Sequence, residues 1–275
     1  MRWLKLLVQR LFIFALGATT VWLIVFVIFD FADQRLPAAV AVAATYGLAA
    51  YVVLPRAIRL GLRIQKRGRV PSYTVTSDGL PGDPVNVVLM GDIQELRQGF
   101  AKAGWWEADK LGPASAWGMA WSFIMSRPYP TAPFSTLYLF GRGQDIGFQR
   151  PIGNSPRKRH HIRFWGVPLE AVEQSLGTAG FWRDSRRPPD HERTLWVGAG
   201  TKDTGISLTR LSFQITHATD ADTNKERSEI VDELAKAGVI KNVRRHMPSE
   251  RVLIGKVNRY VTDGEVAVAD LVKGE

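Results

Sequence analysis

The sequence predicts an α+β protein: an N-terminal two-helix transmembrane hairpin followed by a soluble domain with a largely antiparallel sheet and about three helices. Three observations lead to this prediction. The first 55 residues contain two long runs without a charged residue. The remainder contains three patterns typical of helices that end at a glycine. Among them lie short apolar runs typical of strands, a mixture that favours helices packed on an antiparallel sheet.

The first uncharged run covers residues 11–29, 19 residues in all. A helix of that length reaches about 28 Å, close to the roughly 30 Å hydrocarbon core of a bilayer. A cleaved signal peptide is the alternative. We favour a membrane span because the run exceeds the usual h-region of about 7–15 residues, and because acidic Asp30 follows it instead of a small-residue cleavage site.

The second uncharged run covers residues 38–54, with Pro37 before it and Pro55 after it. A proline at each end is typical of a helix that begins after the first and stops before the second. An interfacial or buried helix is the alternative to a span. Small residues recur at i, i+4 and i+8, which would let a second membrane helix approach closely. They are Ala39, Ala43 and Gly47.

The net charge of +10 belongs mainly to the N-terminal segment. Residues 1–69 carry ten Lys and Arg against two Asp (+8), and residues 70–275 carry 26 against 24 Asp and Glu (+2). A nucleic-acid-binding domain is therefore not expected. The absence of cysteine excludes disulfides, thiol nucleophiles and Cys-ligated metal centres.

Basic residues flank both predicted spans, whereas the connecting loop holds only Arg35. By the positive-inside rule, the N-terminus and the soluble domain should face the cytoplasm. We therefore divide the chain into a hairpin (1–55), a basic juxtamembrane segment and linker (56–84) and an α+β domain (85–275). The basic segment either sets the topology or forms a helix that lies on anionic lipid headgroups.

Within the soluble domain, the helices are predicted to run from Asp92 to Ala103, over 168–179, and from a capping box at Thr223 and Glu226 to residue 237. The glycine-rich segment 198–205 is expected to be the turn of a hairpin that joins two strands. The predicted strands cover residues 85–90, 136–140, 161–165, 194–197, 206–208, 211–216, 252–257 and 265–271.

Four residues are candidates for acid–base chemistry, because a carboxylate can orient a neighbouring imidazole. They are Asp145, His160, His161 and His217. With Asp203 they are also the residues that could hold a metal ion. Adjacent histidines on a strand point to opposite faces, however, and His217 is also explained as a core histidine. We therefore expect neither a resident metal nor a cofactor.

Cationic and phenolic side chains in the same region are candidates for anion binding: Arg127, Tyr129, Arg142, Arg159 and Arg163, with Arg157 and Lys158 nearby. Converging loops would form a pocket for a phosphate or lipid headgroup; otherwise these are solvated charges. No Gly-x-Ser-x-Gly nucleophile motif is present. The glycines of 141–147 are followed by Pro151 where a dinucleotide-binding helix would begin.

Four linked segments resemble the LssY C-terminal domain family: 127–133, 137–142, Asp145 with Phe148 and Gln149, and 159–165. Thr216 with His217, and Glu226 with Arg227, resemble its distal part. The resemblance implies a bacterial, membrane-associated protein without an established activity. Some members are fused to phosphatidic-acid-phosphatase-like or DedA-type membrane domains. The motifs of the lipid phosphatases are absent from this chain.

Two functions are compatible with these observations. One is a non-catalytic module in the bacterial inner membrane that engages anionic lipid headgroups or another membrane protein. The alternative is a hydrolase of a phosphoester or related envelope metabolite that uses a His/Asp/Arg site. Clustering of the candidate side chains in one cleft would favour the hydrolase, and their dispersal over the sheet would favour the module.

Overall fold

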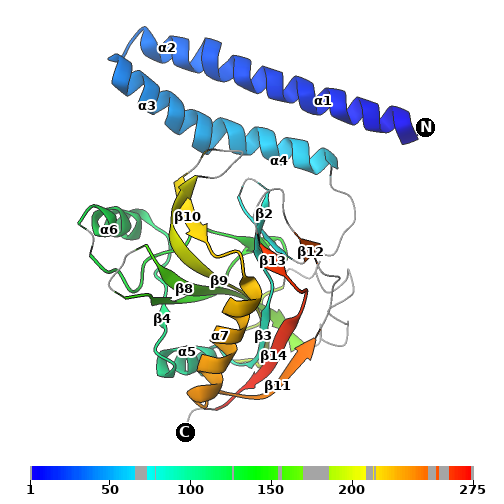
Figure 1. Ribbon diagram of the computed structural model, residues 1–275, viewed down its shortest axis with the longest axis vertical. Helices are drawn as coiled ribbons and strands as arrows, with labels where there is room; N and C mark the ends of the chain where they lie inside the picture. The colour runs from blue at the N-terminus through cyan, green and yellow to red at the C-terminus, as the bar shows by residue number, and fades with distance from the viewer. Residues whose placement is uncertain are drawn as a thin grey trace. The chain divides into compact units, whose positions relative to one another are not determined.

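The computed structural model describes residues 2–65, 73–77, 79–125, 127–153, 157–169, 186–208, 213, 215–246, 252–253 and 260–273. The chain forms two compact units. One consists mainly of the N-terminal helices up to residue 69, and the other is an α+β unit built from most of the remaining chain (Figure 1). The predicted fold class is therefore confirmed.

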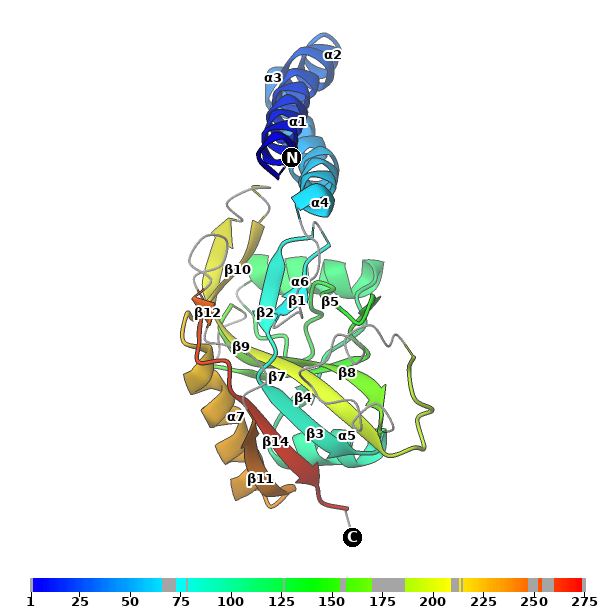
Figure 2. The ribbon, with the colours of Figure 1, turned by 90° about the vertical axis from the view of Figure 1, so that its right-hand side faces the viewer.

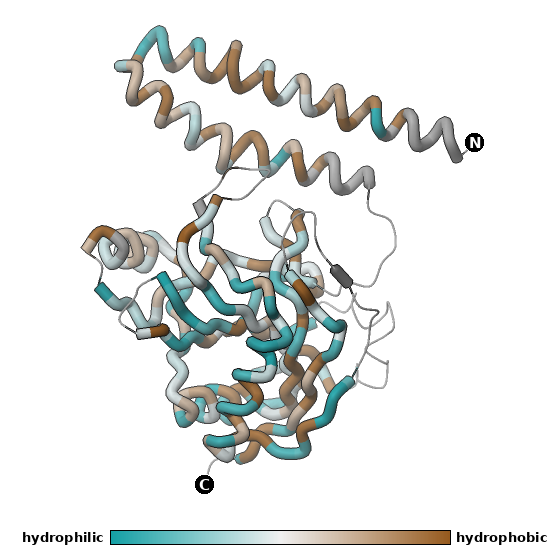
Figure 3. Tube along the Cα trace, viewed as in Figure 1, coloured by the Kyte–Doolittle hydropathy of each residue, from teal (hydrophilic) through white to brown (hydrophobic). Residues whose placement is uncertain are grey.

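Two helices in the N-terminal unit are long and apolar enough to cross a membrane, Arg10–Asp33 and Ala38–Ile58. Both are drawn mostly in hydrophobic colours in Figure 3. Each changes from α to π geometry and back along its length. The first contains α1 (Arg2–Trp22), η1 (Leu23–Phe29) and α2 (Asp30–Asp33), and the second contains α3 (Ala38–Leu48), η2 (Ala49–Val53) and α4 (Leu54–Gln65).

Two details of the second helix differ from the prediction. Pro55 does not end the helix, which continues through α4; the π-helical turn before it changes the hydrogen-bond ladder where proline lacks its N–H. The buried small residues are Ala41, Thr45 and Ala50, whereas Ala39 and Ala43 of the predicted stripe are exposed.

The α+β unit is organised around an eight-stranded sheet with the order β11-β14-β3-β9-β8-β7-β4, with β10 beside β9. Every pair along this order is antiparallel except β14 with β3, which is parallel. The strands are β3 (Val87–Gly91), β4 (Trp106–Glu107), β7 (Ile146–Pro151), β8 (Arg159–Pro168), β9 (Thr194–Leu208), β10 (Ile215–Thr219), β11 (Ile240–His246) and β14 (Val266–Leu271).

Strand β9 runs through the segment predicted as a hairpin turn, so that prediction is wrong. Arg159 to Pro168 of β8 pair with Asp203 to Thr194 of β9 without interruption. The glycines leave room for core side chains. A Cβ atom on Gly198 would lie 2.6 Å from the ring of Phe164, and one on Gly200 would lie 2.5 Å from the Cδ1 atom of Ile230.

Helices α5 (Ile93–Lys102) and α7 (Thr223–Lys236) pack on one face of this sheet, and Figure 2 shows α7 alongside β11 and β14. Their apolar side chains meet those of the central strands, and Phe100 stacks on Phe148 with ring centroids 4.3 Å apart. The core on this face includes Leu89, Leu96, Phe164, Trp196, Ile230 and Leu234.

The predicted start of a helix at Asp92 is confirmed, since Asp92 and Glu95 form a capping box at the beginning of α5. The box predicted for α7 is wrong, because Asp222 is the cap and its carboxylate accepts a hydrogen bond from the Lys225 N–H. Thr223 instead donates to the carbonyl of Val261. The helix predicted over 168–179 lies almost wholly outside the described residues. Helix α6 (Pro113–Ile124) was not predicted.

The opposite face of the sheet is partly covered by a smaller sheet with the order β2-β1-β5-β6. Its strands are β1 (Tyr73–Val75), β2 (Pro81–Pro84), β5 (Tyr138–Leu139) and β6 (Arg142–Gly143). The segment predicted as a linker therefore contains two strands. A second core lies here, with Trp165, Val167 and Val197 packed against Leu137 and Leu139. A separate two-stranded sheet pairs β12 (Val252–Leu253) with β13 (Val261–Thr262).

Two glycines of β9 provide a matched test of this packing. Gly198→Ala should lower the free energy of unfolding by about 1–3 kcal/mol, because the added methyl overlaps the Phe164 ring. Gly205→Ala should be neutral or slightly stabilising, because no atom lies within 4 Å of its Cβ position. Thermal unfolding of the full chain in mild detergent would check this, and equal melting temperatures for the two variants would contradict it.

Candidate functional site

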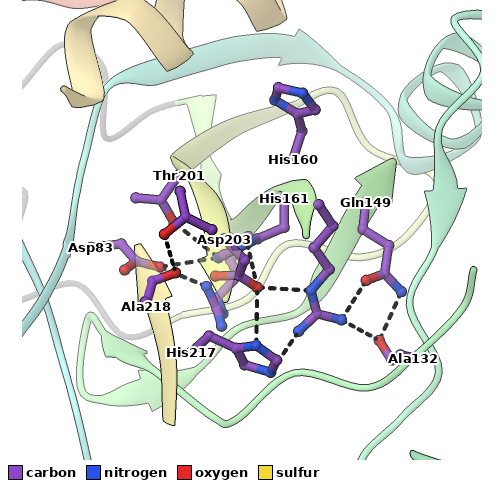
Figure 4. A network of polar contacts seen from close by, with 12 residues as sticks. Asp83, Ala132, Gln149, His160, His161, Thr201, Asp203, His217 and Ala218 are labelled. Carbon is purple, nitrogen blue, oxygen red and sulfur yellow. Dashed lines mark hydrogen bonds and ion pairs between the residues drawn. The ribbon is translucent and has the colours of Figure 1, made fainter. Parts of the chain in front are cut away.

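Strand β8 presents polar side chains to both faces of the sheet, as its alternation predicted. Arg159, His161 and Arg163 point away from the helices α5 and α7 and form ion pairs with carboxylates on that face. His160 points to the helical face and contacts α7. Figure 4 shows His160 apart from the polar network that contains His161.

The carboxylate of Asp203, on β9, is the centre of this network. Its Oδ2 atom accepts a hydrogen bond from the Nε atom of Arg159 at 2.9 Å. The same oxygen lies 3.4 Å from Nδ1 of His161 and 3.8 Å from Nδ1 of His217, on β10. Asp203 is 1% exposed, so these side chains replace water around its charge.

A second buried carboxylate, Asp83 of β2, lies on the other side of His161. It accepts hydrogen bonds from Arg163 at 2.6 Å and from the Tyr260 hydroxyl at 2.9 Å. Its Oδ2 atom is 3.6 Å from Nε2 of His161, which also lies 2.9 Å from the hydroxyl of Thr201. The imidazole of His161 therefore sits between two aspartates.

The network also holds the loop that follows α6. Arg159 donates to the side-chain oxygen of Gln149 at 2.6 Å, and the Gln149 amide donates to the carbonyl of Ala132 at 2.8 Å. The ring of Phe134, in the same loop, lies 5.0 Å from the guanidinium of Arg159 and 4.8 Å from that of Arg163. Both arginines are thereby held in one orientation.

Both buried aspartates are held in the charged form. Burial by itself raises the pKa of each, but nearby positive charge outweighs it: His161 and Arg159 for Asp203, and Arg163 with His161 for Asp83. The pKa of each carboxyl group is therefore below its ordinary value, and both are ionised at pH 7.

The two histidines respond in opposite directions. Burial lowers the pKa of both, and Asp203 raises it. For His161 the carboxylates dominate, and its pKa is raised. For His217 burial dominates, aided by the cations Arg159 and His161, and its pKa is lowered. A neutral His217 oriented by Asp203 can accept a proton, and its side chain is 26% exposed.

The other candidate residues have different partners. Asp145 pairs with Arg142 and accepts the backbone N–H of Gly166 at 2.8 Å. The hydroxyl of Tyr129 donates to Asp109 at 2.6 Å, and Arg127 is exposed. The structure thus brings together Arg159, Arg163, His161 and His217, each beside a carboxylate, while the others lie elsewhere.

Sequence reasoning assigned no role in a site to Asp83 or Tyr260, and it named Gln149 only in the family resemblance. Asp83 lies between prolines in the segment predicted as a linker, where nothing marks it as buried. Gln149 alternates with buried Phe148 on β7, so recognising that strand would have placed it on the face of the network.

Asp203→Asn should lower the free energy of unfolding by about 3–5 kcal/mol, because it leaves Arg159 and His161 buried without this counter-charge. The melting temperature of the full chain in detergent should fall by roughly 2–4 °C per kcal/mol. The control Asp190→Asn removes an exposed pair with Arg187 and should cost at most about 1 kcal/mol. Equal effects for the two variants would contradict the central role of Asp203.

The raised pKa of His161 makes its contribution to stability depend on pH. Its contribution should be fully present below the unfolded pKa of about 6.5 and should be lost as the pH rises through the folded pKa. The difference in melting temperature between the unmodified protein and His161→Asn should therefore narrow between pH 6 and pH 9. If the difference in melting temperature instead widens from pH 6 to pH 9, folding does not raise the pKa of His161.

Comparison with known proteins agrees with the family resemblance of the motifs. The family described as LssY C-terminus matches residues 67–266, most of the chain and nearly all of the α+β unit. No curated protein and no solved structure shows significant similarity. The network around Asp203, including its partners on β2, β7, β8 and β10, lies within the matched residues. The chain belongs to the LssY C-terminal domain family.

Proposed function

We propose that this protein is a non-catalytic, membrane-anchored module whose α+β domain engages anionic lipid headgroups through helix α6. The observation that carries the proposal is the orientation of that helix. Three of its large apolar side chains point outward: Trp117 is 72% exposed, Trp121 50% and Ile124 74%. They recur at i, i+4 and i+7 and therefore form one stripe.

The inward face of α6 includes small residues. Ser122 is buried and donates to the carbonyl of Arg127, and a Cβ atom on Gly118 would lie 3.3 Å from the ring of Tyr129. A helix on the surface of a soluble domain normally buries its apolar stripe and exposes charge. Helix α6 has the reverse arrangement, which favours an apolar neighbour outside the domain.

The residues around α6 favour a bilayer surface as that neighbour. Residues 111–126 contain no charge, and exposed Lys110 and Arg127 stand at the two ends. Indole side chains are enriched where hydrocarbon meets headgroups, and each cation near an anionic surface contributes about 1 kcal/mol. A membrane-protein partner is the alternative occupant.

The N-terminal unit supports the proposal because it supplies an anchor. Its two apolar helices would span the inner membrane of a bacterium, with the N-terminus and the α+β domain in the cytoplasm. In the sequence, three basic residues at and beyond the end of the second apolar run fall at i, i+3 and i+7, the spacing of one helix face. They are Arg56, Arg59 and Arg63.

The hydrolase alternative receives less support from the geometry. Arg159, Arg163 and Arg142 each pair with a carboxylate, which leaves them less available to clamp a phosphoester. Asp145 and His160 lie outside the network that contains His161 and His217. The pairing of His217 with Asp203 is the one observation that favours acid–base chemistry.

The proposed topology can be tested with single cysteines, because the chain has none of its own. A cysteine at Gln34, in the loop between the apolar helices, should react with a membrane-impermeant maleimide in intact spheroplasts. A cysteine at Ser228, on α7, should react only after lysis. The opposite labelling pattern would indicate the opposite orientation in the membrane. Labelling of both sites before lysis would contradict the two-span arrangement.

The contact of α6 with lipid can be tested with the full chain in phosphatidylglycerol nanodiscs. A nitrobenzoxadiazole label on Trp117→Cys should be shielded from iodide and quenched by doxyl-labelled lipid. The same label on Ser228→Cys is the control and should be reached by iodide and not by the lipid quencher. Iodide access at both sites would contradict the proposal. Shielding at residue 117 without lipid quenching would instead indicate a protein neighbour.

A further inference from the structure

Three side chains of the kinds that bind metal ions lie close together on the helical face of the sheet, away from the Asp203 network. The Nδ1 atom of His160 lies 3.0 Å and 2.9 Å from the two oxygens of Glu226 and 3.6 Å from an oxygen of Glu229. One imidazole nitrogen and one oxygen of each carboxylate lie within 4.8 Å of one another. All three residues stand on regular elements, β8 and α7.

Among the described residues, the two carboxylates of this group have one imidazole and one exposed lysine as ion-pair partners. Glu226 is 2% exposed, and in the described part of the chain its only ion-pair partner is His160. Glu229 has His160 and the exposed Lys225, whose Nζ atom is 3.9 Å away. An imidazole has a single Nδ1 proton to share between the two carboxylates.

A third glutamate on α7 shows how a carboxylate is satisfied without an ion. Glu233 accepts a hydrogen bond from the indole N–H of Trp105 at 3.0 Å and pairs with Arg150. Neither kind of partner reaches Glu226 among the described contacts. Glu226 and Glu229 are therefore the carboxylates of this helix for which a bound cation would supply the missing positive charge.

We propose that His160, Glu226 and Glu229 bind one divalent transition-metal ion of the Zn²⁺ or Mn²⁺ class. Donors about 2.1 Å from a tetrahedral zinc ion are about 3.4 Å apart, close to the 2.9 Å and 3.6 Å that separate Nδ1 of His160 from oxygens of Glu226 and Glu229. One nitrogen and two oxygens suit such ions. The side chain of Glu229 is 34% exposed and connects the site to solvent, which can supply the remaining ligand.

The proposal is tested on the full chain in detergent, purified without a histidine tag and stripped with EDTA. Titration calorimetry with Zn²⁺ and with Mn²⁺ should show one high-affinity equivalent for at least one of the two ions. Glu229→Gln should weaken that binding by at least tenfold, since even residues behind the ligands contribute about 10–100-fold. Glu229 is partly exposed, so the Glu229→Gln variant should fold, and near-UV circular dichroism checks that it does.

Two controls separate this site from other parts of the molecule. Glu233→Gln, on the same helix, and His217→Asn, in the Asp203 network, should bind the ion as the unmodified protein does. Absence of a high-affinity equivalent for either ion would overturn the proposal and leave a hydrogen-bonded charge pair. Binding that survives Glu229→Gln, or that is lost in His217→Asn alone, would place the ion elsewhere and overturn it too. None of these outcomes depends on lipid binding by α6.

Discussion

The pairing of the Asp203 carboxylate with the cations around it is the interaction on which the α+β domain depends most. Through Arg159 and His161 it joins β9 to β8, and through His217 it reaches β10. Arg159 then extends the connection to Gln149 on β7 and to the loop at Ala132. Asp203, Arg159 and His161 are buried, so each of these charges is tolerated only because the others are present. We therefore expect strands β7, β8, β9 and β10 to become ordered together.

The uninterrupted pairing of β8 with β9 gives the two faces of the sheet different chemistry. On the helical face, glycines in β9 admit the ring of Phe164 and the side chain of Ile230. On the other face, the same two strands carry apolar residues at one end and the charged network at the other. His160 and His161 are neighbours in sequence, yet one contacts α7 and the other lies between Asp83 and Asp203. One strand thus supplies two separate polar sites.

Local patterns predicted much of the fold. The uncharged runs, the cap at Asp92 and the glycine stops after α5 and α7 are set by short-range physics, which the sequence displays directly. The glycines of β9 led to the wrong prediction of a turn. They are needed because core side chains from other elements occupy the space beside them. Helix α6 escaped prediction since its small residues face inward and its tryptophans outward, the reverse of the usual pattern. Asp83 and Glu226 gain their partners through tertiary contacts that no spacing encodes.

The outward stripe of α6 also has a consequence for copies of the protein that never reach a bilayer. A chain released before its apolar helices insert would carry two indoles and an isoleucine into water on one helix face. Exposed apolar patches of this kind promote self-association and attract holdase chaperones and proteases. In a protein anchored as proposed, the same side chains would then mark copies that fail to insert for degradation.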